Sequence, residues 1–333
     1  MSVAPYFTKG SREMSKIKSK NNTENSVVVN KTPLKLRIYK YRWFYLMFIP
    51  VFIFLLVFNY LPMTGIRYAF YSYRNAFNIK WVGLANFERL FETSAFWTSF
   101  VNTLVISVTK LVLNTGMAVV ISLLLNEMVN LVFKKFTQTI IYLPHFMSWV
   151  VTASVFTLIL STSESGLVNS MLVSLGILAE GEEIYFLASK EYWRVAYYII
   201  NIWKDTGWGT IIFLATLSGI NPELYEAAKI DGAGRWSCIK YITIPSLSNT
   251  IITVLILNLA KIMNLFESVF VLINDNVIDV AQVLQTYTYS ITFAAAPDYG
   301  FSTAVGLFRS LVACILVLIC NFISKKIRGR GIV

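Results

Sequence analysis

Apolar residues in this chain are gathered into blocks about 20 residues long, and these blocks restrict the fold more than any other feature. Hydrophobic residues make up 56% of the 333 positions, more than a soluble chain of this size usually carries. A helix rises about 1.5 Å per residue, so about 20 residues cross an apolar layer of about 30 Å. The sequence therefore predicts an all-α integral membrane protein.

Six of these blocks are long enough to cross a membrane, so we expect six transmembrane helices. They are expected at residues 42–63, 97–126, 137–161, 193–219, 249–272 and 303–324. The second and fourth are longer than the bilayer requires and should extend beyond it. The other expected parts are a basic tail, an outer loop, a core with an inner loop, and a second basic tail, at residues 1–41, 64–96, 97–324 (inner loop 220–248) and 325–333.

Lysine and arginine in the connections predict the orientation. If the N-terminus is cytoplasmic, the inner segments carry nineteen of these residues and the opposite loops carry five. Cytoplasmic loops are typically enriched in both. We therefore expect both termini to be cytoplasmic. The net charge of +11 then reflects this bias rather than nucleic-acid binding, because no folded basic module accompanies the tail.

A short polar stretch between the fourth and fifth blocks has the composition of a docking loop. It reads Glu226-Ala227-Ala228-x-x-Asp231-Gly232-Ala233, and Ile242-x-Ile244-Pro245 follows it. Small side chains let another protein approach closely, and Gly232 permits a backbone turn that a side chain resists. Glu226 supplies a charge, and Pro245 is expected to stop the following segment. The loop is therefore predicted to dock another protein.

Several absences narrow the function. The chain has no phosphate-binding loop, and none of its sixteen glycines is followed by lysine, so we expect it to bind no nucleotide by itself. The single histidine, His145, has no second ligand at metal-binding spacing. Cys238, Cys314 and Cys320 predict neither a disulfide framework nor a metal site. We expect no catalytic residues, no metal and no enzymatic activity.

Polar residues inside the expected helices need a partner or a cavity, because a charge within the bilayer costs about 3 kcal/mol or more. Helical spacing places Asn201, Lys204, Asp205 and Trp208 on one face of the fourth helix, and Asn258, Lys261, Asn264 and Ser268 on one face of the fifth. Lys110 and Arg309 add isolated charges. Lys204 and Asp205 could neutralise each other or neighbouring groups, while the amides form hydrogen bonds between helices. Alternatively, the two faces line a polar path.

The polar stretch resembles the loop of permease subunits in binding-protein-dependent ATP-binding-cassette importers. Further segments resemble the lipoprotein/polysaccharide permease branch of the carbohydrate uptake group. They are Tyr60-Leu61-Pro62-Met63-x-Gly65, Trp81-Val82-Gly83-Leu84-x-Asn86-Phe87, Tyr142-Leu143-Pro144, Trp203-Lys204-x-x-Gly207-Trp208 and Thr286-Tyr287-x-Tyr289. The resemblance covers residues from about 40 to 325. It departs from the usual pattern at Ile244, where leucine is usual, and at 290–293, where a glycine is expected.

The resemblance implies a type I importer permease in the bacterial cytoplasmic membrane. Its implied partners are two ATPase subunits that bind ATP and Mg, a second similar permease, and a lipid-anchored or periplasmic solute-binding protein that delivers a carbohydrate to the outer loops. The residues implied to contact the ATPase are Glu226, Ala227, Ala228, Asp231, Gly232, Ala233 and Pro245. The candidates for contact with the sugar are Asn201, Trp208, Asn258 and Asn264.

Two other functions share parts of this pattern. A permease for peptides, amino acids or ions would have a similar helix count and a similar loop, although the Asp231-Gly232-Ala233 form favours carbohydrate. A six-helix channel subunit would have no reason to carry the docking loop. The identity and length of the sugar, and the partner subunits themselves, do not follow from the sequence.

Overall fold

The computed structural model describes residues 33–75, 77, 79–163 and 166–328, and the expected basic tails lie largely outside these residues. The chain divides into two units, Met1–Thr64 and Gly65–Val333. The described part of the first unit is helical except at Pro33 and at the turn residue Tyr41. Its elements are α2 (Leu34–Lys40), α3 (Arg42–Leu55), the π-helical turn η1 (Leu56–Tyr60) and α4 (Leu61–Met63). Their large apolar side chains are exposed, as a lipid-facing helix requires.

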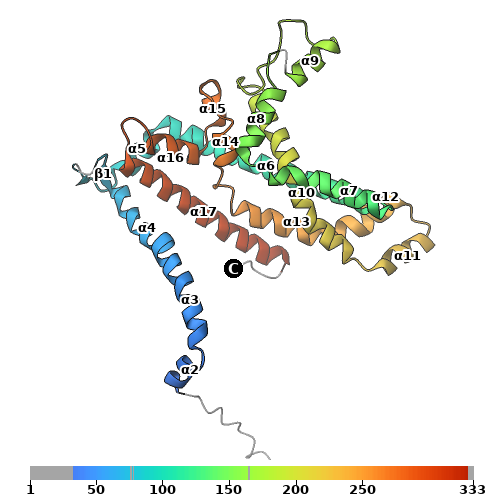
Figure 1. Cartoon of the computed structure of the whole chain (residues 1–333), viewed down its shortest axis with the longest axis horizontal. Coiled ribbons are helices and arrows are strands. Elements are labelled where there is room, and N and C mark those ends of the chain that lie inside the picture. Colours follow the sequence, from blue (N-terminus) through green and yellow to red (C-terminus); the bar gives the residue numbers. More distant parts are fainter. Residues whose placement is uncertain (1–32, 76, 78, 164–165, 329–333) are drawn as a thin grey trace, which may run out of the picture. The chain divides into compact units, whose positions relative to one another are not determined.

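The second unit is built from long helices with short outer elements (Figure 1). Its first elements are η2 (Thr64–Phe70, which begins at the unit boundary), β1 (Tyr71–Tyr73), β2 (Ile79–Trp81), α5 (Ala85–Glu92), α6 (Ser94–Asn126), α7 (Leu131–Tyr142), η3 (Leu143–Phe146), α8 (Trp149–Ile159) and α9 (Leu167–Ser174). The remaining elements are α10 (Trp193–Ser218), α11 (Pro222–Ile230), α12 (Arg235–Cys238), η4 (Ile239–Thr243), α13 (Ile244–Leu259), α14 (Glu267–Phe270), η5 (Asp275–Val277), α15 (Ile278–Ala281), α16 (Leu284–Thr292) and α17 (Tyr299–Arg328).

Within the described residues, four helical stretches are long and apolar enough to cross a membrane. They are Arg42–Phe70, Ser94–Asn126, Arg235–Leu259 and Tyr299–Lys326, and a bent pair, Leu131–Phe146 with Trp149–Ile159, makes a fifth if it counts as one span. The predicted helices at 97–126, 193–219 and 303–324 are confirmed as helices, apart from Gly219, which caps α10. Because α10 contains Arg194, Lys204 and Asp205, it is not among the apolar stretches. The count of six spans stays a prediction.

The predicted helix at 137–161 is not continuous, because the chain bends by 102° between η3 and α8. Pro144 lies in the first turn of η3, and Met147 is extended. Ser148 then caps a new helix, with its Oγ accepting a hydrogen bond from Val151 N at 3.2 Å. A side-chain cap of this kind supplies one of the bonds that a helix start lacks. The bend places His145 at the inner side of the bundle rather than on a continuous helix.

The predicted helix at 249–272 is also displaced, because helical structure runs from Arg235 to Leu259 and then ends. Pro245 does not stop this segment, contrary to the sequence-based expectation. The π-helical turn η4 lies directly before Ile244 and Pro245. A π turn widens the helix locally, which accommodates the proline ring and its missing N–H. The first unit repeats the arrangement, with η1 before Leu61 and Pro62.

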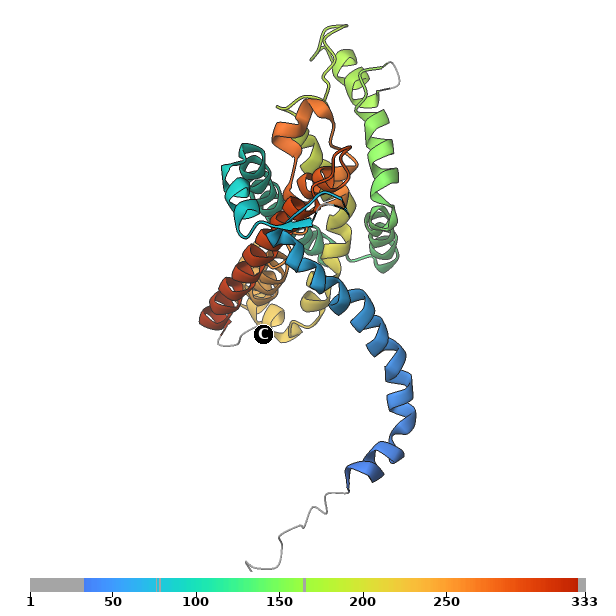
Figure 2. The same ribbon diagram turned by 90° about the vertical axis from the view of Figure 1, so that its left-hand side faces the viewer.

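Small residues allow α6 and α10 to pack closely. A β-carbon added at Gly209 of α10 would lie 3.2 Å from Ala118 Cβ of α6, and one at Gly207 would collide with the carbonyl of Ile141. The buried residues Phe213, Leu217 and Leu247 extend this contact to α13. Close helix approach through small residues is typical of membrane interfaces. In Figure 1 α11 lies at one end of this unit and α16 toward the opposite end, and the turned view in Figure 2 also keeps them apart.

Candidate functional site

The docking helix, α11, is defined at both ends by its own sequence. Asn221 caps the start, with its Oδ1 accepting from Glu223 N at 3.1 Å, and Pro222 occupies the first turn. At the other end Gly232 has φ +80°. Gly232 N donates to Lys229 O at 3.1 Å and Ala233 N donates to Ala228 O at 2.9 Å. These two bonds form a Schellman motif, which needs a residue with positive φ.

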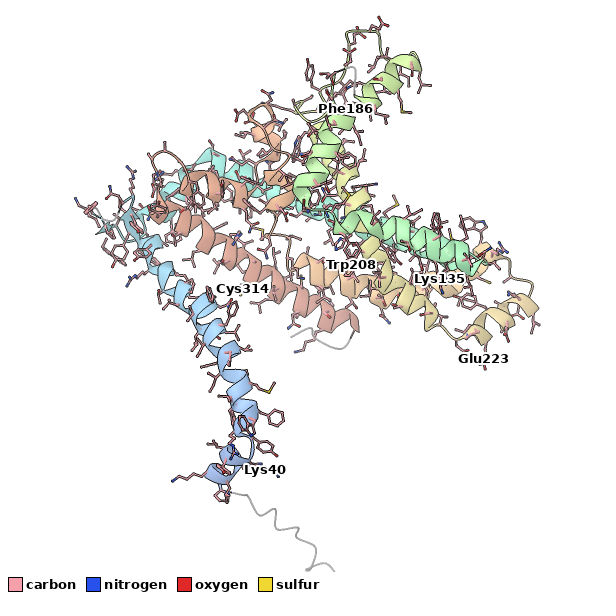
Figure 3. All side chains as sticks on the ribbon, in the orientation of Figure 1. Lys40, Lys135, Phe186, Trp208, Glu223 and Cys314 are labelled. Atoms are coloured by element: carbon pink, nitrogen blue, oxygen red, sulfur yellow. The ribbon has the colours of Figure 1, made fainter. Side chains whose placement is uncertain are left out.

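The predicted docking helix has an exposed surface. Glu226, Ala227, Asp231 and Gly232 are exposed, and Ala228 and Ala233 are partly exposed. Apolar side chains beside them are exposed as well, with Ile230 at 87% and Trp236 at 83%. Figure 3 shows the labelled Glu223 of this helix at the end of the unit, well away from Trp208. An exposed surface that combines apolar and charged residues fits a protein contact.

One contact joins the docking helix to the membrane helix that follows it. Tyr225 Oη and Thr243 Oγ1 lie 3.0 Å apart in a hydrogen bond. Thr243 belongs to η4, and its Oγ1 also donates to Cys238 O at 3.3 Å. Pro245, although predicted to act with the docking residues, is exposed on the first turn of α13 rather than on α11. This hydrogen bond therefore links α11 to η4, the turn that leads into α13.

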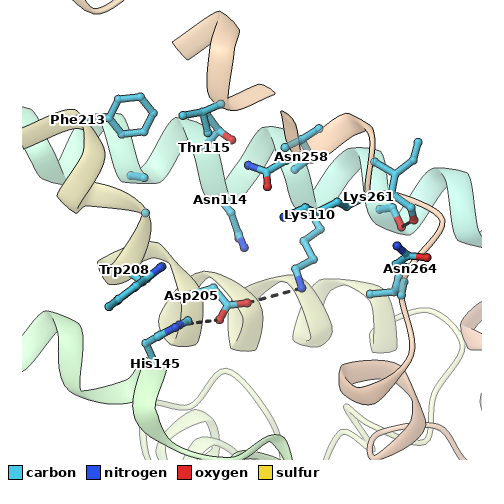
Figure 4. Close-up of a pocket in the computed structure, with 17 residues that line it drawn as sticks. Lys110, Asn114, Thr115, His145, Asp205, Trp208, Phe213, Asn258, Lys261 and Asn264 are labelled. Carbon is cyan, nitrogen blue, oxygen red and sulfur yellow. Dashed lines mark hydrogen bonds and ion pairs between the residues drawn. The ribbon is translucent and has the colours of Figure 1, made fainter. Parts of the chain in front are cut away.

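A polar cavity of about 390 Å³ lies in the second unit. Three segments supply most of its wall: α6, α10 and the chain that leaves α13 (Figure 4). The polar residues that line it are Ser107, Lys110, Asn114, Thr115, His145, Asp205, Trp208, Asn258, Lys261 and Asn264. Since polar groups inside a membrane bundle are costly and face cavities or partners, this cavity is the candidate solute site.

Asp205 is the centre of the charged side of the polar cavity. Lys110 Nζ lies 3.6 Å from Asp205 Oδ2, and His145 Nδ1 lies 3.4 Å from Asp205 Oδ1 without forming a hydrogen bond. The His145 ring also stacks on Trp208, with 4.8 Å between centroids and 10° between planes. Figure 4 shows Lys110 and His145 reaching Asp205 from opposite sides. Asp205 therefore pairs with a lysine of another helix, not with its neighbour Lys204.

Lys204 instead supports the bend between η3 and α8. Its side chain is buried, and Nζ donates to His145 O at 3.0 Å and to Met147 O at 2.7 Å. The ammonium also lies 5.3 Å from the centroid of the Trp149 ring. Carbonyls at the end of a helical turn lack intrahelical donors, and an aromatic face attracts a cation. Lys204 is thus a positioning residue that holds His145 at the cavity.

The third wall of the cavity is formed by Asn258, Lys261 and Asn264, which we call the amide–lysine row. Lys261 N donates to Asn258 O and Asn264 N donates to Lys261 O, both at 2.9 Å. Such i to i+3 bonds give about three residues per turn, so side chains three apart lie in line. Ser107 of α6 holds the row against that helix, because its Oγ donates a hydrogen bond to Ile262 O at 2.7 Å.

The polar cavity gathers three of the four predicted sugar-contact residues. Trp208, Asn258 and Asn264 line it, whereas Asn201 does not. Asn201 is fully buried and its Nδ2 donates to Tyr197 O at 2.8 Å. The predicted stripe on the fifth helix was wrong as a helix face, because α13 ends at Leu259. Ser268 lies elsewhere, hydrogen-bonded to Tyr197 Oη.

The predicted sugar-contact set omitted seven polar residues of the cavity: Ser107, Lys110, Asn114, Thr115, His145, Asp205 and Lys261. Asp205 and Lys261 were noted only as members of the two polar helix faces. Lys110 was noted only as an isolated charge. A positive charge on one membrane helix and a negative charge on another, here Lys110 and Asp205, indicate an ion pair between the two helices. His145 carried no such signal, because its position depends on the bend. In the described part of the chain, no cluster of three or more residues could hold a metal ion.

Comparisons with known proteins agree on one family. Residues 114–329 match the family described as binding-protein-dependent transport system inner membrane component. The chain is 40% identical to the polygalacturonan/rhamnogalacturonan transport system permease protein YteP of Bacillus subtilis (strain 168), over 90% of this chain and 92% of that protein. It is 39% identical to Protein LplB of the same organism, over 87% and 91%.

A solved structure is similar over nearly the whole chain. It is the crystal structure of a bacterial alginate ABC transporter in complex with an alginate pentasaccharide-bound periplasmic protein. One of its chains superposes with a TM-score of 0.81 and 35% sequence identity, and the match covers 90% of this chain and 99% of that one. At this identity and coverage the likeness extends beyond the arrangement of helices to much of the sequence.

Proposed function

This chain belongs to the family of binding-protein-dependent transport system inner membrane components, and from that premise we propose that it is the permease subunit of an ATP-binding-cassette importer for a carbohydrate. One observation carries the proposal. Helix α10 contributes Asp205 and Trp208 to the polar cavity and ends three residues before the exposed docking helix α11. One long helix and a three-residue connection thus join a solute site to a docking surface.

Carbohydrate is the solute that the cavity chemistry favours. Asn114, Asn258 and Asn264 present amides that suit sugar hydroxyls, and the half-exposed indole of Trp208 suits the apolar face of a pyranose. Similar proteins support the same class, since YteP is described as a polygalacturonan/rhamnogalacturonan permease and the similar structure is of an alginate transporter. The chain itself is a transport subunit and not a catalytic one.

The proposed assembly divides the work between chains. Two ATPase subunits bind ATP and Mg, and one of them receives the docking helix through Glu226, the small residues beside it and the Gly232 turn. A second, homologous permease completes the path. A solute-binding protein delivers the saccharide from outside, and the similar alginate transporter was solved with such a periplasmic protein. The chain needs no cofactor, metal or nucleic acid of its own.

The chain has the type I importer permease fold and is a multi-pass membrane protein. We propose six crossings, made by the helix from Arg42, by α6, the bent pair α7 and α8, α10, the helix from Arg235 to Leu259, and α17. Charges on α10 are tolerable because Lys204 and Asp205 are satisfied within the bundle. Nineteen basic residues on one side and five on the other support cytoplasmic termini in a bacterial cell membrane.

Thiol labelling tests this topology. The exposed Asn276 is changed to cysteine in a chain whose exposed native Cys314 is changed to serine. We expect an impermeant maleimide added to intact cells to label Asn276→Cys, and to label Glu223→Cys only after the membrane is opened. Labelling in the reverse order would overturn the proposed orientation.

Uptake measurements test the function. We expect deletion of the chain to abolish uptake of a labelled saccharide, and the wild-type chain to restore it in a vanadate-sensitive manner, since the partner ATPases drive transport. Restoration of peptide, amino-acid or ion uptake instead would identify a permease for a non-sugar solute. Transport that persists without ATP hydrolysis would identify a channel subunit.

A further inference from the structure

We propose that the polar cavity binds the carboxylate of an acidic saccharide, and that Lys261 is the cation that receives it. The inference rests on the proposed import function and extends it by naming the chemistry of the substrate. It follows from which charges in the cavity are already paired and which are free.

The cavity holds more positive than negative charge. Its lining includes two lysines, Lys110 and Lys261, and one carboxylate, Asp205. Asp205 is committed to Lys110 at 3.6 Å and is approached by His145 at 3.4 Å. The two lysines and the carboxylate together sum to one positive charge. A cavity with an uncompensated cation favours an anionic ligand.

Lys261 is the lysine that remains available. Lys110 Nζ is held by Asp205 and lies 5.6 Å from the centroid of the Trp149 ring. The Lys261 side chain is exposed to the cavity and makes no ion pair or hydrogen bond with any residue that the structure describes. Figure 4 shows it apart from the Lys110–Asp205 pair. A ligand carboxylate can therefore bind Lys261 without breaking an existing bond.

The two neighbours of Lys261 suit the rest of an acidic sugar. Asn258 and Asn264 flank it at three-residue spacing, both are exposed, and their side chains are unengaged among the described residues. A uronic acid unit carries one carboxylate and adjacent hydroxyls on the same ring. The amide–lysine row thus offers one charge-assisted bond, which is about twice as strong as a neutral one, between two neutral hydrogen-bonding groups.

The opposite wall does not repel such a ligand. The charge of Asp205 is compensated by Lys110 on one side. The face of Trp208 that His145 covers is unavailable, but the indole is 51% exposed and can pack against the sugar ring. A neutral saccharide would fill the same space and leave Lys261 without a partner, so the site discriminates by charge rather than by shape.

Equilibrium binding to the intact complex tests the inference. The complex is purified through a tag on this chain and incubated without binding protein or nucleotide. The probes are tritiated trigalacturonate and its fully methyl-esterified form, which keeps the size and removes the charge. We expect the wild type to bind the acid at least about tenfold more tightly than the ester at low salt, with the preference shrinking as salt rises.

Three variants sharpen the test. Lys261→Gln should weaken binding of the acid about tenfold and binding of the ester by less than about twofold. Lys261→Arg keeps the charge and should stay within about threefold of wild type for the acid. Lys135→Gln removes an exposed lysine outside the cavity and should change neither. Equal losses for acid and ester in Lys261→Gln, or no loss for either, would overturn the assignment.

Two results separate this inference from the proposed function. If the wild type binds and imports neutral saccharides with no preference for the acid, the charge-based selection is wrong and the import function stands. If deletion of the chain affects uptake of no saccharide of either kind, the import function fails as well. Should Lys261→Gln not assemble, the acid-to-ester ratio of the wild type and its salt dependence still decide the matter.

Discussion

The docking helix and the polar cavity are built in opposite ways. Residues 221–233 contain the cap, the helix and the terminating turn of α11, and the bonds that define its ends are local. The cavity joins Lys110, His145, Asp205 and Lys261, which come from four separate segments. A local site is encoded by spacing, whereas an assembled site depends on how segments pack. Variants in the two regions should therefore fail in different ways.

The largest effect is expected from Glu226→Lys. Glu226 is exposed on α11, and reversing its charge against a basic partner costs several kcal/mol. We expect ATP-driven uptake to fall about a hundredfold, while saccharide binding to the solubilised complex stays unchanged. Glu127→Lys, at an exposed residue at the end of α6, is the matched control. Loss of saccharide binding in Glu226→Lys would show that the two regions are not separable.

The next largest effect is expected from Lys204→Met, a substitution beside the polar cavity rather than on the docking helix. The substitution leaves two partly buried carbonyl acceptors, of His145 and Met147, without their donor. We expect the free energy of unfolding to fall by about 3 kcal/mol and saccharide binding to weaken, while the ATPase still copurifies. Lys135→Met, at an exposed position, serves as control in the thermal melt. An unchanged melting temperature would mean that Lys204 does not support the bend.

Gly232→Val tests the backbone of the docking helix without changing its charge. Gly232 has φ +80° and its missing side chain would meet open space, so the cost is backbone strain of about 1–2 kcal/mol. We expect about tenfold weaker capture of the ATPase. Gly232→Asn should stay close to wild type, because asparagine tolerates this conformation. If the wild type, Gly232→Val and Gly232→Asn all capture the ATPase equally, the turn at Gly232 takes no part in docking.

The smallest effect is expected from Asn258→Leu, paired with Asn201→Leu. Asn258 faces the cavity, and losing one hydrogen bond to a sugar hydroxyl should weaken binding about fivefold at unchanged stability. Asn201 is buried and bonded to Tyr197 O, so its substitution should lower the melting temperature and leave binding by the folded complex intact. The opposite pattern would indicate that Asn201 lines the solute path and that Asn258 does not.

The two prolines that follow π turns show where local patterns mislead. Pro245 carries the usual signal of a helix end, yet η4 and α13 run through it. The π turn before Ile244 makes this possible, and such turns have no reliable sequence signal. The same limit applies to the end of α13 at Leu259, which no glycine or proline marks. There Ser107, a residue of α6, fixes the new path by bonding Ile262 O.

By itself, the sequence determined the class of the protein, most of its long helices and the docking helix, because hydropathy blocks, caps and glycine turns act over a few neighbouring residues. Tertiary structure decided the support that Lys204 gives the bend before α8, the pairing of Asp205 with Lys110 and the path of the chain after α13. Each of these depends on a group from a distant segment that satisfies a charge or a carbonyl within an apolar surrounding. Such satisfaction is a property of the packed bundle, and no single segment of the sequence contains it.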